Sequence, residues 1–192
     1  MAVFKTGFEM NAKKAAKQRI HVLRFGHRKK RDIRVTSHCC LVARAFGAEK
    51  IIIDGDKEDK AEKTLEGVNK RFGKGIIVEQ AGWKKTLKFY KKKGWKIVHL
   101  TMYGEQLGER IGEIRKESKV LVFVGAEKVP GEVYKIADWN IGVGNQPHSE
   151  IAALAVFLHE FWQGKELTQE FKKAERKIVP NARGKQVLSL KK

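Results

Sequence analysis

Residues 139–162 read WNIGVGNQPHSEIAALAVFLHEFW, in which a short β-branched strand, a polar loop and an apolar helix follow one another. The same order of strand and helix recurs upstream. Five other β-branched runs occur: RIHVLRF at 19–25, KIIID at 50–54, GIIVEQ at 75–80, WKIVHLTM at 95–102 and KVLVFVG at 119–125. Each run is typical of a strand that is buried on both faces. Their alternation with helices predicts an α/β domain with a mainly parallel sheet.

Glycines mark the ends of several expected helices. Gly47, Gly73, Gly94 and Gly164 stand where a left-handed helix C-cap is expected. The segments with helical spacing lie at 38–48, 59–73, 83–94, 105–118, 132–137 and 151–162.

Outside the alternating region, the chain changes character. We expect one domain over residues 19–164, with a basic N-terminal extension at 1–18 before it. A C-terminal extension follows at 165–192. In it, KELTQEFKKAERK at 165–177 is typical of an exposed charged helix, and the β-like runs KIVP and QVLSL around NARGK predict a small hairpin.

The net charge is strongly positive. The chain has 41 Lys and Arg against 22 Asp and Glu, a formal charge of +19 and a pI near 10.0. Such a charge indicates an acidic partner, which is a nucleic acid, an anionic membrane or an acidic protein. No apolar run reaches the roughly 20 residues of a membrane-spanning helix, and the N-terminus lacks the apolar stretch of a signal peptide. We therefore expect a cytoplasmic protein that does not bind a membrane.

Several common cofactor and metal sites have no matching motif. The sequence lacks GxxxxGK[ST], and the GxG of Gly142 and Gly144 has Pro147 where a dinucleotide fingerprint needs its third glycine. The histidines are scattered, without HExxH or CxxC, so we expect no metal site. Cys39 and Cys40 are adjacent, which is poor geometry for a disulfide, and are expected to be buried packing thiols.

Three polar loops follow strand ends, which is the edge where open α/β sheets bind ligands. They are GHRKKRDIRVTSH at 26–38, GAEKVPGE at 125–132 and GVGNQPHSE at 142–150. In the third loop the glycines let a ligand approach the backbone, and Pro147 has the φ angle of a first helical turn. Backbone N–H groups near Ser149 are then available to a ligand.

Taken singly, these loops also have simpler interpretations. For the third loop, the simpler interpretation is that Asn145 or Gln146 caps the helix that follows and that the loop binds no ligand. In the second, Gly125 only forms a turn, and Glu127 and Lys128 are a solvated pair. The three loops together favour a ligand site.

Three long motifs lie in or beside these loops: LRFGHRKKRDIRVTSHCCLVARAFGA at 23–48, VGAEKVP at 124–130 and VGNQPHSEIAALAVFLH at 143–159. Together they resemble the archaeal tRNA cytidine(56)-2′-O-methyltransferases of the SPOUT class and cover most of residues 19–160. The resemblance implies a C-terminal segment threaded into a deep trefoil knot, which general topology rules would reject. It also implies S-adenosyl-L-methionine bound in a bent form in the knot, tRNA as substrate, and a homodimer with active sites near the subunit interface.

By motif position, the resemblance also implies which residues surround the cofactor. Leu154 is either an adenine contact or a plain core residue, and we expect the core. The implied cofactor residues are Leu100, Gly125, Ala126, Glu127, Lys128, Val129, Val143, Gly144, Asn145, Gln146, Pro147, His148, Ser149 and Glu150.

Methyl transfer to a ribose hydroxyl needs a 2′-oxygen aligned with the methyl group, and help in removing its proton. In related ribose methylases, the removal of this proton is commonly assigned to an arginine of the first motif. A charged guanidinium has no acceptor lone pair, so its expected role is to hold a phosphate and stabilise the developing alkoxide. At the equivalent position, counted back from Gly47, this chain has Leu41. The candidate catalytic residues are Arg34 first, then Arg31 and Arg28, with His38 as an alternative base.

Other basic residues are expected to bind RNA without a catalytic role. Lys29 and Lys30, beside Arg28, form such a run. Further contacts are expected from the hairpin, through Arg183 and Lys185, and from the lysine-rich residues 84–96, for which a solvated helix face is an equal alternative.

Two other functions fit parts of the sequence. A basic RNA-binding protein without catalysis would explain the charge, but it gives no reason for the polar loop GNQPHSE at 144–150. A methyltransferase of the same fold with another RNA target fits equally well, because the shape of the RNA around the site selects the nucleotide.

Overall fold

Among the residues that the structure describes, 18–125 and 128–190, six strands form one parallel sheet in this computed structural model. The order is β3-β2-β1-β5-β4-β6, from β1 (Arg19–His27), β2 (Lys50–Gly55), β3 (Ile77–Gln80), β4 (Lys96–Gln106), β5 (Lys119–Gly125) and β6 (Trp139–Gly142). The expected α/β architecture with a mainly parallel sheet is therefore confirmed.

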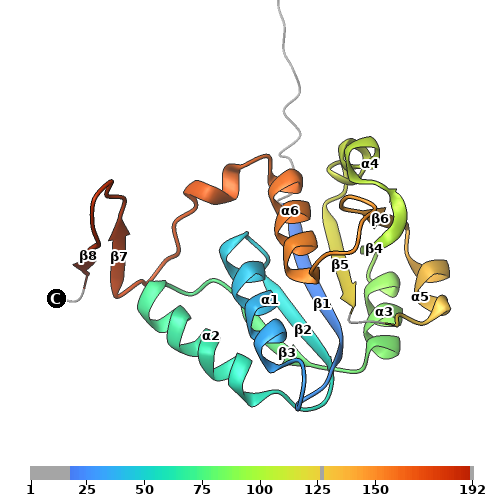
Figure 1. Cartoon of the computed structure of the whole chain (residues 1–192), viewed down its shortest axis with the longest axis horizontal. Helices are drawn as coiled ribbons and strands as arrows, with labels where there is room; N and C mark the ends of the chain where they lie inside the picture. Colours follow the sequence, from blue (N-terminus) through green and yellow to red (C-terminus); the bar gives the residue numbers. More distant parts are fainter. Residues whose placement is uncertain (1–17, 126–127, 191–192) are drawn as a thin grey trace, which may run out of the picture.

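Helices cover both faces of this sheet (Figure 1). They are α1 (Ile33–Ala45), α2 (Asp59–Phe72), α3 (Trp83–Lys92), α4 (Leu107–Ile114), α5 (Gly131–Ile136) and α6 (Glu150–Trp162). Helices α1, α2, α4 and α6 pack around Val22 and Val122 on one face, whereas α3 and α5 pack around Leu23 and Phe123 on the other. Adjacent strand residues point to opposite faces, so the central strands need apolar residues at nearly every position. Leu154 is fully buried, as expected of a core residue.

β3 differs from the expectation of burial on both faces. It pairs only with β2 and lies at the edge of the sheet. Ile77 is 55% exposed there. The prediction was wrong for this strand because a β-branched run does not reveal whether the strand will be central or at an edge.

The C-terminal segment is also only partly as expected. The hairpin is confirmed, with β7 (Arg176–Val179) antiparallel to β8 (Gln186–Ser189). The charged helix expected at 165–177 is wrong, because the helical part is a single 3₁₀ turn, η1 (Lys165–Thr168). Beyond it, tertiary hydrogen bonds hold the chain away from helical geometry: Gln169 Nε2 donates to the Ala45 carbonyl and Lys74 N–H to the Lys172 carbonyl.

Most of the glycine caps and the two cysteines agree with expectation. Gly47, Gly94 and Gly164 have positive φ at the helix ends, whereas Gly73 has φ 91° but ψ 152°, which is not the left-handed helical cap expected there. Cys39 and Cys40 are fully buried on α1, and burial raises the pKa of the Cys39 thiol to about 12.

Of the expected basic extension at 1–18, only Gln18 belongs to the described residues. Within the described chain, no helix has the length and apolar character needed to cross a bilayer. No group of three or more His, Cys, Asp or Glu in that same part is placed to hold a metal ion.

His21 is a buried titratable residue of β1. Its Nδ1 lies 2.6 Å from the Tyr90 hydroxyl, and its ring packs against Trp95 with 4.2 Å between centroids. Burial, together with the charges of Arg19 and Lys50, lowers the pKa of His21 from 6.5 to about 4. The unfolded chain therefore binds a proton between these pH values that the folded chain does not. The stability contributed by neutral His21 is fully present above pH 6.5 and is lost as the pH falls towards 4.

We expect acid to destabilise the wild-type protein more than a His21→Gln variant. Between pH 6.5 and 4, the difference in the fall of unfolding free energy should be at most about 3 kcal/mol. Urea unfolding of both proteins at a series of pH values measures it. Parallel curves for the two proteins would contradict the assignment.

Candidate functional site

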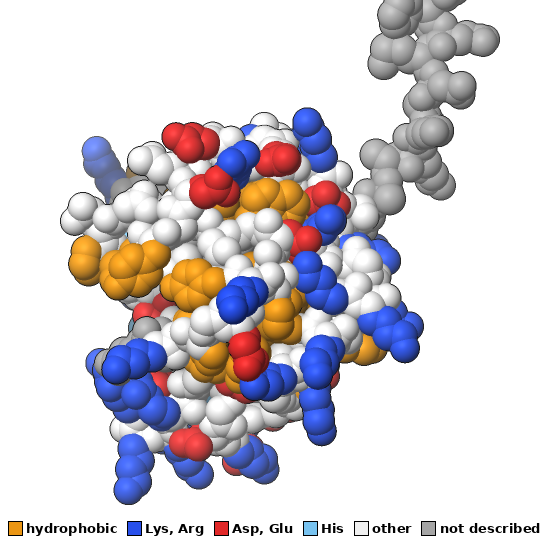
Figure 2. Space-filling view, turned by 90° about the vertical axis from the view of Figure 1, so that its right-hand side faces the viewer, with side chains coloured by type: hydrophobic (Ala, Val, Ile, Leu, Met, Phe, Trp, Pro, Cys, Tyr) orange, Lys and Arg blue, Asp and Glu red, His pale blue; other side chains and the backbone are white. Residues whose placement is uncertain are grey.

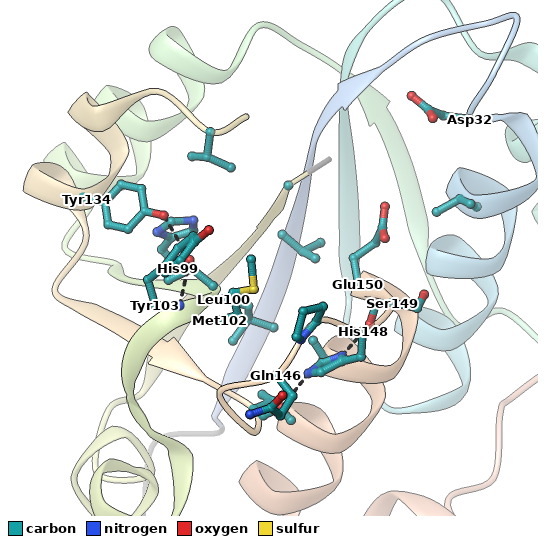
Figure 3. A pocket seen from close by; sticks show the side chains of 18 of the residues that line it. Asp32, His99, Leu100, Met102, Tyr103, Tyr134, Gln146, His148, Ser149 and Glu150 are labelled. Atoms are coloured by element: carbon teal, nitrogen blue, oxygen red, sulfur yellow. Dashed lines mark hydrogen bonds between the residues drawn. The ribbon is translucent and has the colours of Figure 1, made fainter. Parts of the chain in front are cut away.

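A cavity of about 470 Å³ opens at the carboxyl ends of the central strands (Figure 3). The loop after β1 and the start of α1 supply one part of its wall, and the ends of β4 and β5 supply another. The loop between β6 and α6 closes the third side. Its lining residues are Arg28, Arg31, Asp32, Val35, His99, Leu100, Thr101, Met102, Tyr103, Val124, Gly125, Val129, Tyr134, Val143, Gln146, Pro147, His148, Ser149, Glu150 and Ala153.

An irregularity in β4 shapes this cavity. β4 pairs with β6 as far as Leu100, breaks register, and pairs again from Glu105. Leu100 and Glu105 both pair with Ile141, so the intervening residues, 101–104, form a bulge without β6 partners in the ladder. A Cβ atom on Gly104 would lie 2.5 Å from backbone atoms of Asn140 and Ile141. The two strands therefore meet in backbone contact, which only glycine permits here.

Asn145 holds the loop after β6 against this irregularity. Its Nδ2 donates to the carbonyl oxygens of Met102 at 2.8 Å and Gly104 at 2.9 Å. The alternative of Asn145 or Gln146 as the helix cap is wrong, because the N-cap of α6 is Ser149, whose Oγ accepts from Ile151 N–H at 3.2 Å.

Pro147 also differs from its expected role in the first helical turn. It lies two residues before the N-cap of α6, outside the helix, and lines the cavity instead. The neighbouring His148 braces the loop, since its Nε2 donates to the Val143 carbonyl at 2.6 Å. This hydrogen bond closes the loop between residues 143 and 148. Within the loop, Gly144 has positive φ.

Arg24, which no sequence motif singled out, contacts the end of this loop. It is fully buried, and its Nη2 lies 3.2 Å from Glu150 Oε1 on the cavity wall. The ion pair ties β1 to the first residue of α6. A signal was present, because Arg24 is a charge in an apolar strand and faces the same side as Val22.

Replacing Glu150 by glutamine is expected to lower the unfolding free energy by about 3 kcal/mol, because the Arg24 guanidinium would stay buried without its carboxylate. The double variant Arg24→Met/Glu150→Gln should regain most of this loss, since the buried charge is removed as well. Urea unfolding of both variants and of the wild type measures the effect. A Glu150→Gln protein as stable as the wild type would show that the pair does not hold α6.

At the first loop, Arg28 is tied to the buried Asp32. Its Nε donates to Asp32 Oδ2 at 3.0 Å, and its backbone N–H donates to the same oxygen at 3.1 Å. Burial alone would raise the pKa of Asp32, but these hydrogen bonds outweigh it and hold the pKa below its ordinary value. Asp32 is therefore an anion that fixes the orientation of Arg28 at the cavity.

The structure separates the candidate catalytic residues. Arg31 lines the cavity, as does Arg28. Arg34 and His38 are exposed on α1 and are not among the lining residues. The reason is that α1 begins at Ile33, earlier than expected, so residues one turn apart at 34 and 38 share a helix face directed away from the cavity.

Most of the expected cofactor residues meet at this cavity. Leu100, Gly125, Val129, Val143, Gln146, Pro147, His148, Ser149 and Glu150 line it. Lys128, Gly144 and Asn145 do not, and Ala126 and Glu127 lie outside the described residues. Other lining residues were not predicted from the sequence, among them the rest of the β4 segment, namely His99 and Thr101 to Tyr103, and Tyr134 of α5. A signal for the β4 residues was their adjacency to Leu100.

The expected RNA-binding residues are exposed but spread over the surface. Lys29 and Lys30 flank the cavity without lining it, and Arg183 and Lys185 lie at the hairpin. That hairpin projects beyond the end of α2 (Figure 1). On the side that carries α3 and α5, Lys and Arg side chains crowd the lower half, below a band of hydrophobic side chains (Figure 2).

Solved structures define the class of this fold. The chain is similar to an RNA 2′-O ribose methyltransferase with a TM-score of 0.60 and 17% identity, over 83% of this chain and 60% of that one. The SpoU methyltransferase AviRb from Streptomyces viridochromogenes gives a TM-score of 0.60 and 11% identity, over 77% and 58% of the two chains. For the TrmH/SpoU tRNA modifying enzyme of A. aeolicus the values are 0.56 and 18%, over 79% and 76%. The fold is that of the SpoU and TrmH methyltransferases.

Sequence comparison then identifies the family. The model of the family described as tRNA ribose 2′-O-methyltransferase, aTrm56, matches residues 72–188. The tRNA (cytidine(56)-2′-O)-methyltransferase of Methanothrix thermoacetophila is 52% identical over 170 residues, which are 88% of this chain and 97% of that protein. The enzyme of the same name from Methanopyrus kandleri is 48% identical over 167 residues, 86% and 94% of the two chains. The chain belongs to this family of tRNA ribose 2′-O-methyltransferases. The alternative function, that of an RNA-binding protein without catalysis, is therefore not supported.

Proposed function

We propose that the protein transfers a methyl group from S-adenosyl-L-methionine to the 2′-hydroxyl of cytidine 56 in tRNA. Relatives at 52% and 48% identity are named for this reaction. AviRb, of the same fold, was crystallised in complex with AdoMet. The observation that carries the proposal is the convergence of the β4 irregularity and three polar loops on one cavity at the carboxyl ends of the strands.

The cavity fits a cofactor of this chemistry. Its volume of about 470 Å³ lies within the roughly 300–1,000 Å³ of small-molecule sites. Leu100, Val124 and Val129 provide apolar wall for an adenosine group. One buried polar atom of the wall, His99 Nε2, has no partner in the described protein and offers an acceptor to a ligand.

Bound S-adenosyl-L-methionine supplies an electrophilic methyl group on a sulfonium. The protein must hold the ribose so that its 2′-oxygen meets that methyl in line. We place Arg28 and Arg31 at this step, because both line the cavity and arginine binds RNA phosphates well. Arg28 is held by Asp32 and is placed to bind an RNA phosphate, and we assign to Arg31, on the same cavity wall, the stabilisation of negative charge developing on the 2′-oxygen. A charged guanidinium has no acceptor lone pair, so the hydroxyl proton leaves to solvent.

We also propose the trefoil knot that the resemblance implies. Residues 101–104 leave the β4 ladder and return to it, and the loop after β6 is fastened against their carbonyl oxygens by Asn145. From there the chain enters α6, which packs on α1 across the sheet face. A chain end passing through such a curve is the arrangement that a knot requires.

The assembly and domain organisation are proposals of the same kind. We propose a homodimer, supported by the exposed apolar Val156 of α6, at 45%, and Tyr103 beside the cavity, at 76%. Residues 19–164 would form the methyltransferase domain, with 1–18 as a basic extension. Residues 165–192 would be an accessory segment whose Arg183 and Lys185 contact tRNA in the cytoplasm.

The test is transfer of labelled methyl from S-adenosyl-L-methionine to an unmodified tRNA transcript, followed by mapping of the modified nucleotide. A matched transcript carries 2′-deoxycytidine at position 56, which removes only the accepting hydroxyl. We expect one 2′-O-methyl group at cytidine 56 and none in the matched transcript. Incorporation at another nucleotide would contradict the proposed target, and no incorporation into any tRNA would contradict the reaction.

Cofactor binding is expected to stabilise the folded protein. At a concentration of S-adenosyl-L-methionine one hundred times its Kd, the unfolding free energy should rise by about 2.7 kcal/mol. Thermal unfolding with and without the cofactor measures this, with adenosine triphosphate as a control for general anion binding to a chain of charge +19. Equal shifts with the two ligands would contradict specific binding.

A further inference from the structure

His99 is a fully buried histidine in the wall of the cavity. It lies on β4 just before the irregularity and faces α5. Its ring makes edge-to-face contacts with Phe123, 5.4 Å between centroids, and with Tyr134, 4.6 Å. In Figure 3, His99 and Tyr134 lie across the cavity from Gln146 and His148.

The hydrogen bonds around His99 determine which of its nitrogens carries the proton. Asn140 Nδ2 donates to the Tyr134 carbonyl at 3.0 Å, so the Asn140 amide oxygen faces His99. That oxygen lies 2.8 Å from His99 Nδ1 and can only accept. Nδ1 is therefore protonated, and Nε2 carries a lone pair.

This lone pair has no donor in the described protein, although Nε2 is fully buried. A buried acceptor without a partner is unfavourable, and native structures rarely leave one unless a ligand or water supplies the donor. Because the ring lines the cavity, the donor can come from a bound molecule. The His99 ring packs against Phe123 and Tyr134, and Val129 lines the same cavity. These aromatic and aliphatic surroundings suit the adenosine part of the cofactor better than its charged methionine part.

We infer that His99 binds the methyl donor through Nε2, which accepts a hydrogen bond from an N–H or O–H group of the adenosine. The inference rests on the proposed cofactor site and adds to it the residue that recognises the nucleoside. It differs from a role for His99 as general base. Burial lowers the pKa of His99, so Nε2 accepts a hydrogen bond without becoming protonated itself.

The first test compares two substitutions of His99. In His99→Asn the amide nitrogen lies near the position of Nδ1 and keeps the bond to Asn140, but nothing replaces Nε2. In His99→Gln the amide oxygen reaches the position of Nε2 and restores an acceptor. Isothermal titration calorimetry with S-adenosyl-L-methionine should show affinity roughly tenfold lower for His99→Asn, with part of it regained by His99→Gln.

His21→Asn is the matched control, because His21 is also a buried histidine with a lowered pKa on the same sheet face, away from the cavity. Thermal unfolding of each ligand-free variant separates stability from binding. We expect both asparagine variants to lose stability and only His99→Asn to lose affinity. Equal affinities of wild type and His99→Asn, or equal losses in both variants, would overturn the inference. A wild-type protein that does not bind the cofactor would overturn the proposed site itself.

Titration with 5′-methylthioadenosine and 5′-methylthioinosine then identifies the donor. Both lack the amino acid part, and the inosine compound also lacks the 6-amino group. If that amino group donates to Nε2, His99→Asn weakens the binding of 5′-methylthioadenosine only. If a ribose hydroxyl donates, both are weakened equally. If neither is weakened, His99 does not contact the adenosine and the inference fails.

Discussion

Replacing Arg31 by alanine is expected to lower the rate of methyl transfer to tRNA by roughly two to three orders of magnitude. Arg31 lines the cavity, as does Arg28, whose Nε donates to Asp32 Oδ2 at 3.0 Å. The charge that develops on the 2′-oxygen lies in a partly enclosed site, where a fixed cation is more effective than water. The rate at saturating tRNA measures this effect apart from binding, which a lost phosphate contact would change through KM.

Arg34→Ala is the matched control for this prediction. It removes the same charge three residues further along the chain, from the face of α1 that does not line the cavity. We expect it to weaken tRNA binding by less than about tenfold at physiological salt, as for one phosphate contact, and to leave the saturated rate unchanged. If Arg34→Ala loses the rate and Arg31→Ala keeps it, Arg31 is excluded, and Arg34 must reach the site from a second subunit.

The largest loss of stability is expected from Gly104→Ala. The added Cβ would lie 2.5 Å from backbone atoms of Asn140 and Ile141. Backbone in the β4–β6 contact cannot move aside as a flexible side chain would, so we expect the unfolding free energy to fall by about 3 kcal/mol or more. Urea unfolding measures the loss. Asn145 would also lose its contact with the Gly104 carbonyl, so stabilisation by S-adenosyl-L-methionine should weaken in the same variant.

Gly112→Ala, eight residues further along the chain, is expected to have the opposite effect on stability. Gly112 lies within α4, and a Cβ there meets nothing within 4 Å. Alanine is the better helix residue, so the variant should be more stable by about 0.5–1 kcal/mol. Two glycine substitutions with opposite effects would show that contact, and not chain flexibility, determines the loss at position 104. If Gly104→Ala is as stable as the wild type, the β4 irregularity is not a rigid part of the site.

The class of fold and the edge of the sheet that carries the site were both predictable from the amino-acid pattern alone. Buried parallel strands need apolar residues on both faces, so runs such as KVLVFVG at 119–125 were visible without a structure. Glycine is the residue best suited to positive φ, which made helix ends such as Gly47 and Gly94 visible. Parallel strands end on the same side, so loops far apart in sequence were expected to meet.

Which residues face the cavity, and what they contact, depends instead on how the helices and strands pack. Whether Arg34 or Arg31 lines it depends on where α1 begins, and the local pattern did not fix that boundary. The buried contact of Arg24 with Glu150 and the unpartnered Nε2 of His99 each depend on residues distant in sequence. Residues 165–177 have helical composition but are held mostly non-helical by bonds such as that from Gln169 to Ala45. Periodicity reports whether a side chain is buried, because burial depends on the local face of an element. It does not report the partner, because the partner is set by how the elements pack.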